Sequence, residues 1–420
     1  GGRVAIVGAG PAGLAAAHDL RLRGWEVSLF DRADVPGGML RYGIPKFRLP
    51  QQALESDVKR ILDLGVKFIG GRGLGENLWL GDLLEEFDRV LIAVGAWRTS
   101  ALELPREGSD APTSLDALDF LHDSGSAATG LRVAVIGGGN AGIDAARSAQ
   151  RAGALQVSVI EREAKIPALF HEVDAARLEG VELLPGLTPT VLVGGDIRGV
   201  RCLGGAGEDD LKHIPADLVV IAVGQEVERE LWRASDPKLV CGPGGTMSVD
   251  PITCVTSDLR VFAAGDVAPG PRTVTEAVAQ GKRAAWGIDK AQRGAPADRR
   301  PPPPPLTGQA WPKTTPPSLP TSRADQQVTL HPAILPVEQR IGQAEVVGCF
   351  TEQQARTEAA RCMLCGSCSS CRACLDTYGC PAFFVEQGLI KIDSKLCTGC
   401  GACASICPNG AIVPITGAHA

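Results

Sequence analysis

The residues with the clearest chemistry in this chain are cysteines, because ten of the fourteen lie between Cys362 and Cys407. The last four have the spacing C-x2-C-x2-C-x3-C and precede Pro408, a pattern typical of bacterial [4Fe-4S] domains. Three closely spaced thiolates hold three corners of a cubane, and in two-cluster folds the last Cys of each run ligates the other cluster. We therefore predict two [4Fe-4S] clusters with these ligands: Cys397, Cys400, Cys403 with Cys380, and Cys368, Cys371, Cys374 with Cys407.

The first cysteine run departs from that pattern, because five residues rather than three precede Cys380. Cys362 and Cys365 exceed the eight ligands, and they could be structural or could replace Cys368 or Cys371. A structural zinc site is the less favoured alternative, since four cysteines would suffice for it. Clustered x2 spacings indicate metal binding in a reducing compartment, so we expect a cytoplasmic protein. Burial as small apolar side chains is favoured for the other four: Cys202, Cys241, Cys254 and Cys349.

A second chemical signal is the glycine-rich turn that follows the apolar run at Val4–Val7. An Ala- and Leu-rich helix follows the turn, and a strand at Val27–Phe30 ends on Asp31. This order predicts a dinucleotide-binding βαβ unit, in which glycines admit a pyrophosphate and the acid accepts ribose hydroxyls. The predicted binding residues of the turn are Gly8, Gly10, Pro11, Ala12 and Gly13.

The same arrangement recurs later in the chain, which predicts a second nucleotide site facing the first. The strand at Val133–Ile136 precedes the second turn, and the strand at Val157–Ile160 ends on Glu161 and Arg162. Each copy is closed by an apolar strand ending on glycine, Gly95 in the first and Gly224 in the second. The predicted binding residues of the second turn are Gly137, Gly139, Asn140, Ala141 and Gly142.

The remaining segments position these sites. The stretch 36–50 is predicted as a Gly- and Pro-rich loop, and it is followed by a helix at 51–64 and a strand at 66–69. Residues 260–266 form a further strand that ends on Gly265 and Asp266, and a helix with capping-box spacing follows at Thr273. The run of five prolines at 301–305 is interpreted as a linker, 328–347 as a segment extended across another domain, and 351–361 as a helix.

We therefore expect an α/β protein with two Rossmann-like domains, the second inserted in the first, and a small two-cluster ferredoxin-like domain. The expected boundaries are 1–118 and 252–293 for the first nucleotide domain, 119–251 for the second, 294–348 for the linker and extended segment, and 349–420 for the cluster domain. The net charge of −6 offers no basic surface for nucleic acid. No apolar run approaches the length of a membrane span.

At this point a family resemblance is recognisable. The first 290 residues resemble the flavoprotein small subunit of glutamate synthase and the FAD/NADPH half of dihydropyrimidine dehydrogenase. The motifs that carry it are Gly8–Gly13, Gly37-Gly38 through Pro50, Gly137–Gly142 and Ala264-Gly265-Asp266. The block 351–408 resembles the ferredoxin tail of NAD(P)H:acceptor flavoproteins, which serve benzoyl-CoA reductases, 2-oxoacid oxidoreductases and tungsten aldehyde oxidoreductases. We expect the N-terminal cluster domain of the family to be missing from this sequence and the clusters to lie in its C-terminal part.

The resemblance implies FAD in the first unit, NAD(P) in the second and hydride transfer between them. It implies that Asp31 holds the adenosine ribose and that Arg48 reaches the cofactor phosphates or ring. It also implies that Gly37, Gly38 and Leu40 line the flavin, that Asp266 contacts the ribityl chain, and that Thr273 and Val274 lie at the isoalloxazine. Relatives that use NADPH tend to carry two consecutive basic residues after the second strand, whereas this chain has Glu161-Arg162-Glu163, so NAD is favoured over NADP.

No catalytic side chain is assigned, because His171 and His213 are interpreted as surface or hydrogen-bonded core residues. The loop after Gly38 lacks the redox Cys pair of related disulfide reductases, which leaves the clusters to accept electrons. The favoured hypothesis is an electron-transfer subunit that serves a partner redox enzyme or a ferredoxin. The alternatives are a stand-alone NAD(P)H:ferredoxin oxidoreductase, a glutamate-synthase-type small subunit, an oxidoreductase with its own organic substrate, and a non-catalytic scaffold.

Overall fold

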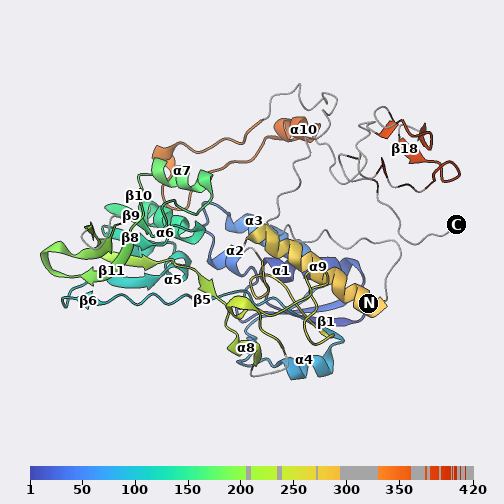
Figure 1. Cartoon of the computed structure of the whole chain (residues 1–420), viewed down its shortest axis with the longest axis horizontal. Coiled ribbons are helices and arrows are strands. Elements are labelled where there is room, and N and C mark those ends of the chain that lie inside the picture. The colour runs from blue at the N-terminus through green and yellow to red at the C-terminus, as the bar shows by residue number, and fades with distance from the viewer. Residues whose placement is uncertain are drawn as a thin grey trace. The chain divides into compact units, whose positions relative to one another are not determined.

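The structure is a computed structural model that describes residues 1–204, 210–233, 239–270, 273–293 and 330–360, together with part of the C-terminal stretch: 374–375, 379–386, 389–398, 400, 402–403, 407 and 412. The chain divides into two compact units (Figure 1). Unit 1 holds Gly1–Leu306 and Leu335–Val346, and unit 2 holds Thr307–Ile334 and Val347–Ala420. Each unit is described by itself.

The first domain of unit 1 is built on a parallel sheet in the order β16-β4-β1-β2-β3. The apolar runs that precede each loop are buried on both faces of this sheet, as a parallel sheet covered on both sides requires. The strands are β1 (Arg3–Val7), β2 (Glu26–Phe30), β3 (Lys67–Ile69), β4 (Arg89–Ile92) and β16 (Val261–Ala263).

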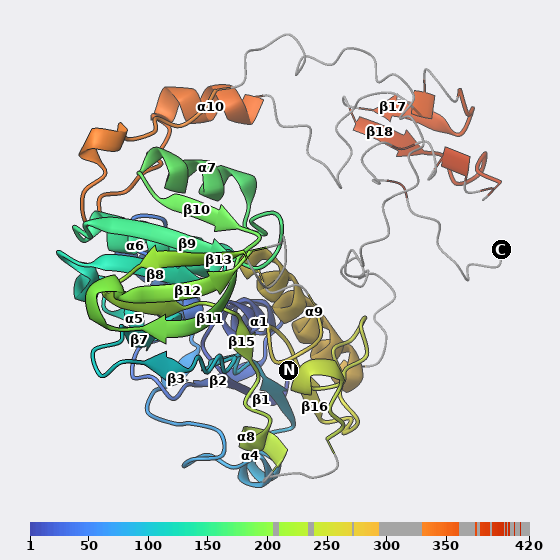
Figure 2. The ribbon, with the colours of Figure 1, turned by 60° about the vertical axis from the view of Figure 1, so that its left-hand side comes forward.

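Helices cover one face of this sheet, and loops with short helices cover the other. Val4 and Ile6 point toward α1 (Pro11–Leu22), α3 (Gln51–Asp63) and α9 (Val274–Arg293), with which they share a core. Ala5 and Val7 point to the opposite core, which includes α4 (Leu80–Glu86), Trp232 of α8 (Glu230–Arg233) and Met247. Figure 2 shows α1 and α9 running along the same face of the sheet. The alternation of Val4 to Val7 thus separates two cores.

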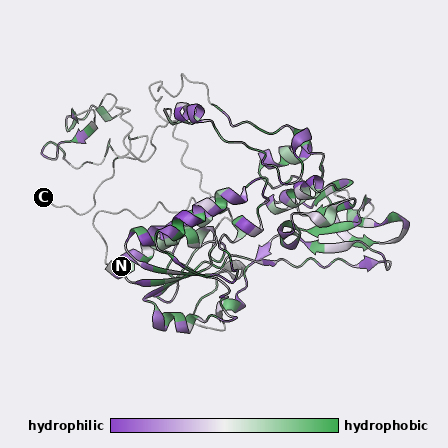
Figure 3. Ribbon diagram, turned by 180° about the vertical axis from the view of Figure 1, so that it is seen from behind, coloured by the Kyte–Doolittle hydropathy of each residue, from purple (hydrophilic) through white to green (hydrophobic). Residues whose placement is uncertain are grey.

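The second domain repeats the parallel sheet, in the order β10-β9-β8-β14-β7. Its strands are β7 (Thr113–Asp116), β8 (Arg132–Ile136), β9 (Gln156–Glu161), β10 (Glu182–Pro185) and β14 (Leu218–Ile221). One face packs on α5 (Ala117–His122), η1 (Ser126–Ala128), α6 (Asn140–Arg151) and α7 (Phe170–Leu178). In Figure 3 the strands carry most of the green, and the helices alternate between green and purple.

A four-stranded sheet covers the other face of the second domain, in the order β13-β12-β11-β6. Its core includes Leu192, Val200 and Cys202, which pack on Ala134 and Ile160 of the parallel sheet. The elements are β6 (Arg106–Glu107), β11 (Thr188–Val193), η2 (Gly195–Ile197), β12 (Gly199–Leu203) and β13 (Leu211–Pro215). Antiparallel strands therefore take the place that helices hold on many parallel sheets.

The two domains are joined where β5 (Arg98–Thr99) pairs with β15 (Gln225–Glu226). The second sheet begins before the expected boundary at residue 118, because β7 pairs with β14. The first core resumes before the expected boundary at residue 252, because Val227 and Met247 pack in it. Short-range patterns mark strands, but they do not tell which sheet a strand joins.

Two further segments differ from or extend the sequence expectations. The stretch 36–50, predicted to be a loop, contains a single helical turn, α2 (Met39–Tyr42). The segment 335–346, which includes η5 (Val337–Gln339), belongs to unit 1. The sequence predicted an extended course for 328–347, but residues 335–346 form a closed loop, because the amide of Leu335 donates to the carbonyl of Val346 at 2.8 Å.

Unit 2 contains the helix α10 (Glu352–Ala360), as the sequence predicts. It also contains an antiparallel hairpin of β17 (Phe383–Glu386) and β18 (Leu389–Ile392), which stands between the two cysteine runs. One more short element, η3 (Pro243–Gly245), belongs to unit 1. In the parts of the chain that the structure describes, no helix is both long enough and apolar enough to cross a bilayer.

Candidate nucleotide and cluster sites

The first glycine turn brings three backbone segments too close together for side chains. Gly8 has φ of +108°, and a Cβ there would lie 2.2 Å from the carbonyl oxygen of Ala93, at the end of β4. A Cβ on Gly13 would lie 1.9 Å from the carbonyl oxygen of Gly8. Glycine is required at both positions, because only its absence of a side chain lets α1 begin this close to β1.

The second turn repeats this geometry in detail. Gly137 also has φ of +108°, and its Cβ would lie 2.4 Å from the carbonyl oxygen of Ala222. A Cβ on Gly142 would lie 1.9 Å from the carbonyl oxygen of Gly137. Gly95 and Gly224 follow the strands that close the two copies, and both have positive φ. The internal repeat therefore extends from the sequence to the backbone conformation.

The middle glycine of each turn faces open space. A Cβ on Gly10 would meet its nearest atom, Cα of Gly38, at 3.9 Å, and one on Gly139 would meet nothing within 4 Å. Each is the N-cap residue of its helix, has no side-chain cap, and is followed by a first turn without acidic residues. The positive dipole end of each helix is therefore not neutralised by an acidic side chain of its own first turn. Both turns fit the pyrophosphate of a dinucleotide.

Acidic side chains after the second strand of each copy hold the glycine turns in place. Asp31 accepts hydrogen bonds from the Ala9 amide through Oδ2 at 2.6 Å and from the Ala33 amide through Oδ1 at 2.8 Å. Glu161 accepts from the Gly138 amide through Oε2 at 2.6 Å and from the Glu163 amide through Oε1 at 2.8 Å. Each carboxylate oxygen keeps further acceptor capacity, so these groups can also receive ribose hydroxyls.

A cavity joins the first glycine turn to the expected flavin residues. It is lined by residues from the turn, from the loop after β2 and from the end of β16: Gly8, Gly10, Pro11, Ala12, Asp31, Gly38, Gly95, Gly265 and Asp266. A second, more apolar cavity is lined by Leu40, Arg48 and Val274. Gly37 donates its amide to the carbonyl of Ala9 at 2.9 Å, which ties this loop to the turn.

Sequence analysis missed Gln280, a polar residue on the buried side of α9. Its side-chain oxygen accepts from the amide of Gly265 at 2.8 Å, and its amide nitrogen donates to the carbonyl of Pro269 at 3.1 Å. Thr273 caps the same helix, since its hydroxyl accepts from the amide of Glu276 at 3.2 Å. The Gly265-Asp266 turn is therefore held against α1 by α9. A glutamine at a position of the helix that is otherwise apolar could have indicated this buried polar contact.

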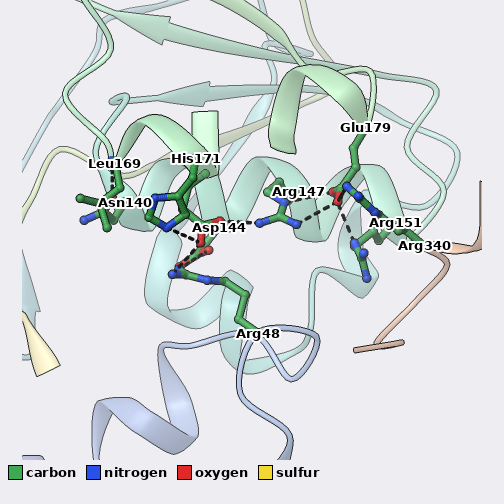
Figure 4. A network of polar contacts seen from close by, with 10 residues as sticks. Arg48, Asn140, Asp144, Arg147, Arg151, Leu169, His171, Glu179 and Arg340 are labelled. Carbon is green, nitrogen blue, oxygen red and sulfur yellow. Dashed lines mark hydrogen bonds and ion pairs between the residues drawn. The ribbon is translucent and has the colours of Figure 1, made fainter. Parts of the chain in front are cut away.

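Arg48 makes contacts that sequence reasoning did not anticipate. The resemblance implied contact with a cofactor, whereas Nη1 donates to the Asp144 carboxylate at 2.7 and 2.8 Å and Nη2 lies 2.9 Å from Oε1 of Glu172. Both carboxylates belong to the second domain. Burial raises the pKa of Asp144 to about 6, although the Arg48 charge opposes the shift. Figure 4 shows this network, which continues through Arg147 to Glu179.

The other polar residues of the second turn are placed differently from one another. Asn140 accepts the amide of Leu169 through Oδ1 at 3.0 Å, which holds the loop before α7 beside the turn. Arg162 is 75% exposed and lies 3.5 Å from Glu163. His171 is more than half exposed, and its Nε2 lies 3.6 Å from Glu172. His213 is part-buried on β13.

The cysteine block is described only in part. Cys368 and Cys371 lie outside the described residues, so their expected role as ligands stays a prediction. Cys374 is buried, Cys397 and Cys400 are exposed, and Cys380, Cys403 and Cys407 are half-buried. Within the residues that the structure does describe, no three His, Cys, Asp or Glu side chains are grouped as metal ligands. The amide of Cys407 donates to the carbonyl of Cys403 at 3.0 Å.

The four isolated cysteines differ in how far they are buried. Cys202 and Cys254 are buried as predicted, and burial raises the pKa of their thiols to about 12 and about 11. Cys241 is half-buried. Cys349 is exposed, so the prediction of a buried side chain was wrong there, because it lies in a connecting segment just before α10 rather than in a core.

Comparison with protein families accounts for both halves of the chain. Residues 2–281 match the model of the pyridine nucleotide-disulphide oxidoreductases, and residues 390–413 match that of the 4Fe-4S binding domain. The chain belongs to the pyridine nucleotide-disulphide oxidoreductase family. This oxidoreductase accordingly binds FAD and NAD(P), and its C-terminal part binds an iron-sulfur cluster. The glycine turns described above fit the two nucleotides.

Several curated proteins resemble this oxidoreductase over 70% of its length. It is 39% identical to the beta subunit of the NADP(+)-dependent formate dehydrogenase of Moorella thermoacetica, of which the match covers 44%. It is 35% identical to the small chain of the NADPH glutamate synthase of Azospirillum brasilense, with 68% of that chain covered. It is 34% identical to the NAD-dependent dihydropyrimidine dehydrogenase subunit PreT of Escherichia coli, with 69% covered. The resemblance read from the motifs is confirmed.

Proposed function

We propose that this chain is an electron-transfer subunit, which passes electrons between NAD(P)(H) and a partner redox protein through FAD and two [4Fe-4S] clusters. The observation that carries the proposal is the pair of glycine turns with the same backbone geometry in one unit, in a chain that also has a C-terminal cluster domain. Bound FAD would accept a hydride from the nicotinamide and release its two electrons singly to the clusters. The three relatives compared above are named as subunits or chains of enzymes, which supports a partner subunit.

The first turn is assigned to FAD and the second to NAD(P). The cavity at Gly10 continues from the first turn to Gly265 and Asp266, the direction in which a flavin would extend from the pyrophosphate. Asp31 is proposed to hold the adenosine ribose, and the residues about the flavin are proposed to be Gly37, Gly38, Leu40, Thr273 and Val274. The protein contributes the amides of the helix N-termini, the ribose acceptors and the exclusion of water.

The absence of a nearby dithiol supports single-electron exit. The sequence has no cysteine before Cys202, and Cys202 is buried in the four-stranded mixed sheet of the second domain. A dithiol beside the loop after Gly38, as in the disulfide reductases of the same family, is therefore excluded by the sequence. The cluster domain remains as the acceptor.

NAD is proposed as the preferred nicotinamide nucleotide. Glu161 is buried and anchored to the second turn, and so its carboxylate stands where a 2′-phosphate would bring a second negative charge. Repulsion in a partly buried site could cost a few kcal/mol. Arg162 is exposed and could reach such a phosphate, and the relatives include both NADP- and NAD-dependent enzymes.

Anaerobic reduction of the purified chain tests the proposal. We expect non-covalent FAD, eight irons as two [4Fe-4S] clusters by the ferredoxin pattern, and reduction of a viologen dye that is faster with NADH than with NADPH. Cys400→Ala should remove one cluster and leave FAD in place. Zinc without acid-labile sulfide would refute the clusters, and a holoprotein that neither nucleotide reduces would refute the function. A specificity constant about tenfold higher for NADPH, or 1.4 kcal/mol, would show that Arg162 outweighs Glu161.

A further inference from the structure

The segment 335–346, which we call the anchor loop, closes on itself and packs on unit 1. The amide of Leu335 donates to the carbonyl of Val346 at 2.8 Å, so the two ends of the loop meet. Inside the loop, Arg340 donates from Nε to the carbonyl of Leu335 at 2.8 Å. The loop is therefore a defined structure after a long proline-rich stretch, rather than a continuation of it.

The anchor loop touches both nucleotide-binding domains. The amide of Val346 donates to the carbonyl of Phe47 in the first domain at 3.2 Å. In the second domain, Arg151 donates to the carbonyls of Gly342 and Ala344, each at 3.1 Å, and the Arg340 guanidinium lies 3.2 Å from Glu179. One short segment thus bridges two domains that the chain otherwise joins at the β5–β15 ribbon.

Phe47 lies at the centre of this bridge. It is 1% exposed, and its ring is covered by the guanidinium groups of Arg151 at 4.2 Å and Arg147 at 4.9 Å from the ring centroid. A cation above an aromatic ring is attracted to the ring's negative face, and this attraction is stronger where water is excluded. A side chain of the first domain in this way packs against two arginines of α6 in the second domain.

A buried charge network continues across the same interface. Arg48 of the first domain contacts Asp144 and Glu172 of the second, and Arg147 contacts Glu172 and Glu179 (Figure 4). With Arg151 and Arg340, four guanidinium groups face three carboxylates. If one member of a buried network is removed or displaced, its partner's charge stays buried without compensation. Such a network therefore favours one orientation of the two domains over others.

We propose that the anchor loop and this charge network, called the interdomain lock, hold the two nucleotide-binding domains in one orientation, with Arg48 as a positioning residue rather than a cofactor ligand. The inference rests on the proposed function, since the orientation matters for transfer between two nucleotide sites. A hydride moves only when the reacting atoms are about 3–3.5 Å apart, and a displacement of about 1 Å can cost 100-fold in rate. The β5–β15 ribbon pairs only two residues of each strand, and the lock adds buried, charged contacts between the same two domains.

Single-turnover reduction of the flavin in the full-length holoprotein tests the role of Arg48. Arg48→Gln should lower the limiting rate at saturating NADH about tenfold or more, while FAD content and the dissociation constant of NADH stay within about twofold. Arg48→Lys keeps the charge without the two-pronged geometry and should recover part of the rate. Arg356→Gln is the matched control, because Arg356 is an exposed arginine whose partner, Glu352, is on its own helix, α10.

Three outcomes would overturn the proposal. An unchanged limiting rate in Arg48→Gln would show that the network does not set the orientation. Loss of FAD in that variant would show that Arg48 binds the cofactor, as the family resemblance implied. A pair of variants, Arg48→Gln and Asp144→Asn, whose effects simply add in the double variant would show that the two side chains are not coupled.

Hydrogen exchange tests the lock without any electron transfer. Arg340→Met removes the contact with Glu179, so the amides of Gly342 and Val346 should exchange at least about tenfold faster than in the parent chain. Amides of α1, away from the loop, should exchange at the parental rate. Unchanged protection of Gly342 and Val346 would refute the lock. If the parent chain is not reduced by NADH but this exchange result holds, the proposed function fails and the lock stands.

Discussion

The two glycine turns have the same backbone, but the helices that follow them face different surroundings. Counting from the first glycine, Ala15 and His18 of α1 correspond to Asp144 and Arg147 of α6. Ala15 and His18 line a largely apolar cavity, whereas Asp144 and Arg147 are buried in the charge network. The two turns therefore keep one backbone geometry, which suits a pyrophosphate. The residues on the outward face of each helix differ, and they determine what that helix packs against.

A second contrast lies in the cover of the two sheets. Loops and short helices cover the first sheet opposite α1, and a four-stranded mixed sheet covers the second opposite α6. The repeat therefore preserves the nucleotide geometry while the outer layers diverge, as separate burial of each sheet face allows.

The strongest test of the equivalence of the turns is to add one methyl group to each. Gly13→Ala and Gly142→Ala both place a Cβ 1.9 Å from a carbonyl oxygen, so each should lower the free energy of unfolding by about 3 kcal/mol or more. Gly81→Ala, inside α4 with nothing within 4 Å of its Cβ, should be neutral or stabilising. Urea unfolding measures all three. If Gly13→Ala lowers the free energy of unfolding and Gly142→Ala does not, the two turns are not structurally equivalent.

The middle glycines should separate the two nucleotides. Gly10→Val places its side chain in the first site and should abolish the flavin absorbance of a folded protein. Gly139→Val should keep full flavin and weaken binding of NADH about 100-fold, or 2.7 kcal/mol. Flavin absorbance and NADH titration distinguish the pair. A folded Gly10→Val chain with full flavin would reverse the assignment of the two turns.

The buried carboxylate of α6 should make stability depend on pH in a direction opposite to that of most acids. Burial raises the pKa of Asp144 to about 6, above the value of about 3.9 in an unfolded chain. The folded chain therefore holds a proton that the unfolded chain releases, and this stabilisation, full below pH 4, is lost as pH rises through 6.

The groups that face Asp144 are Arg48, Glu172 and Arg147. Relative to Asp144→Asn, which cannot titrate, the parent chain should gain about 1.4 kcal/mol as pH falls from about 7.5 to 5. Urea unfolding of both proteins across that range measures the difference. If the parent chain instead loses stability toward pH 5 relative to the variant, the ion pair with Arg48 outweighs burial.

The smallest expected effect concerns the isolated thiols. Burial raises the pKa of Cys202 to about 12, so its thiolate is scarce at pH 8 and its modification requires opening of the second domain. Cys349 is exposed and should react first with a maleimide. Mass spectrometry of peptides from a briefly treated holoprotein gives the order. Equal rates would indicate that the core of the second domain opens readily and that Cys202 is not protected by burial.

The sequence by itself determined the elements whose signal is local. The strand, turn and helix at 3–22 and at 132–151 were predictable, because apolar runs, glycines and terminal acids follow one another at short range. The ferredoxin spacing predicted the C-terminal domain in the same way. A glycine that packs closely against another backbone segment can be recognised in the sequence, because no residue with a side chain fits at that position.

Only the tertiary structure decided the contacts between segments distant in the chain. Arg48 meets Asp144 across 96 residues, and Arg340 meets Glu179 across 161. The sequence shows that these residues are charged, but charge alone does not choose a partner. Which cofactor or carboxylate an arginine faces depends on how two separately folded domains dock, and that is set by shape and by the net cost of burying each charge.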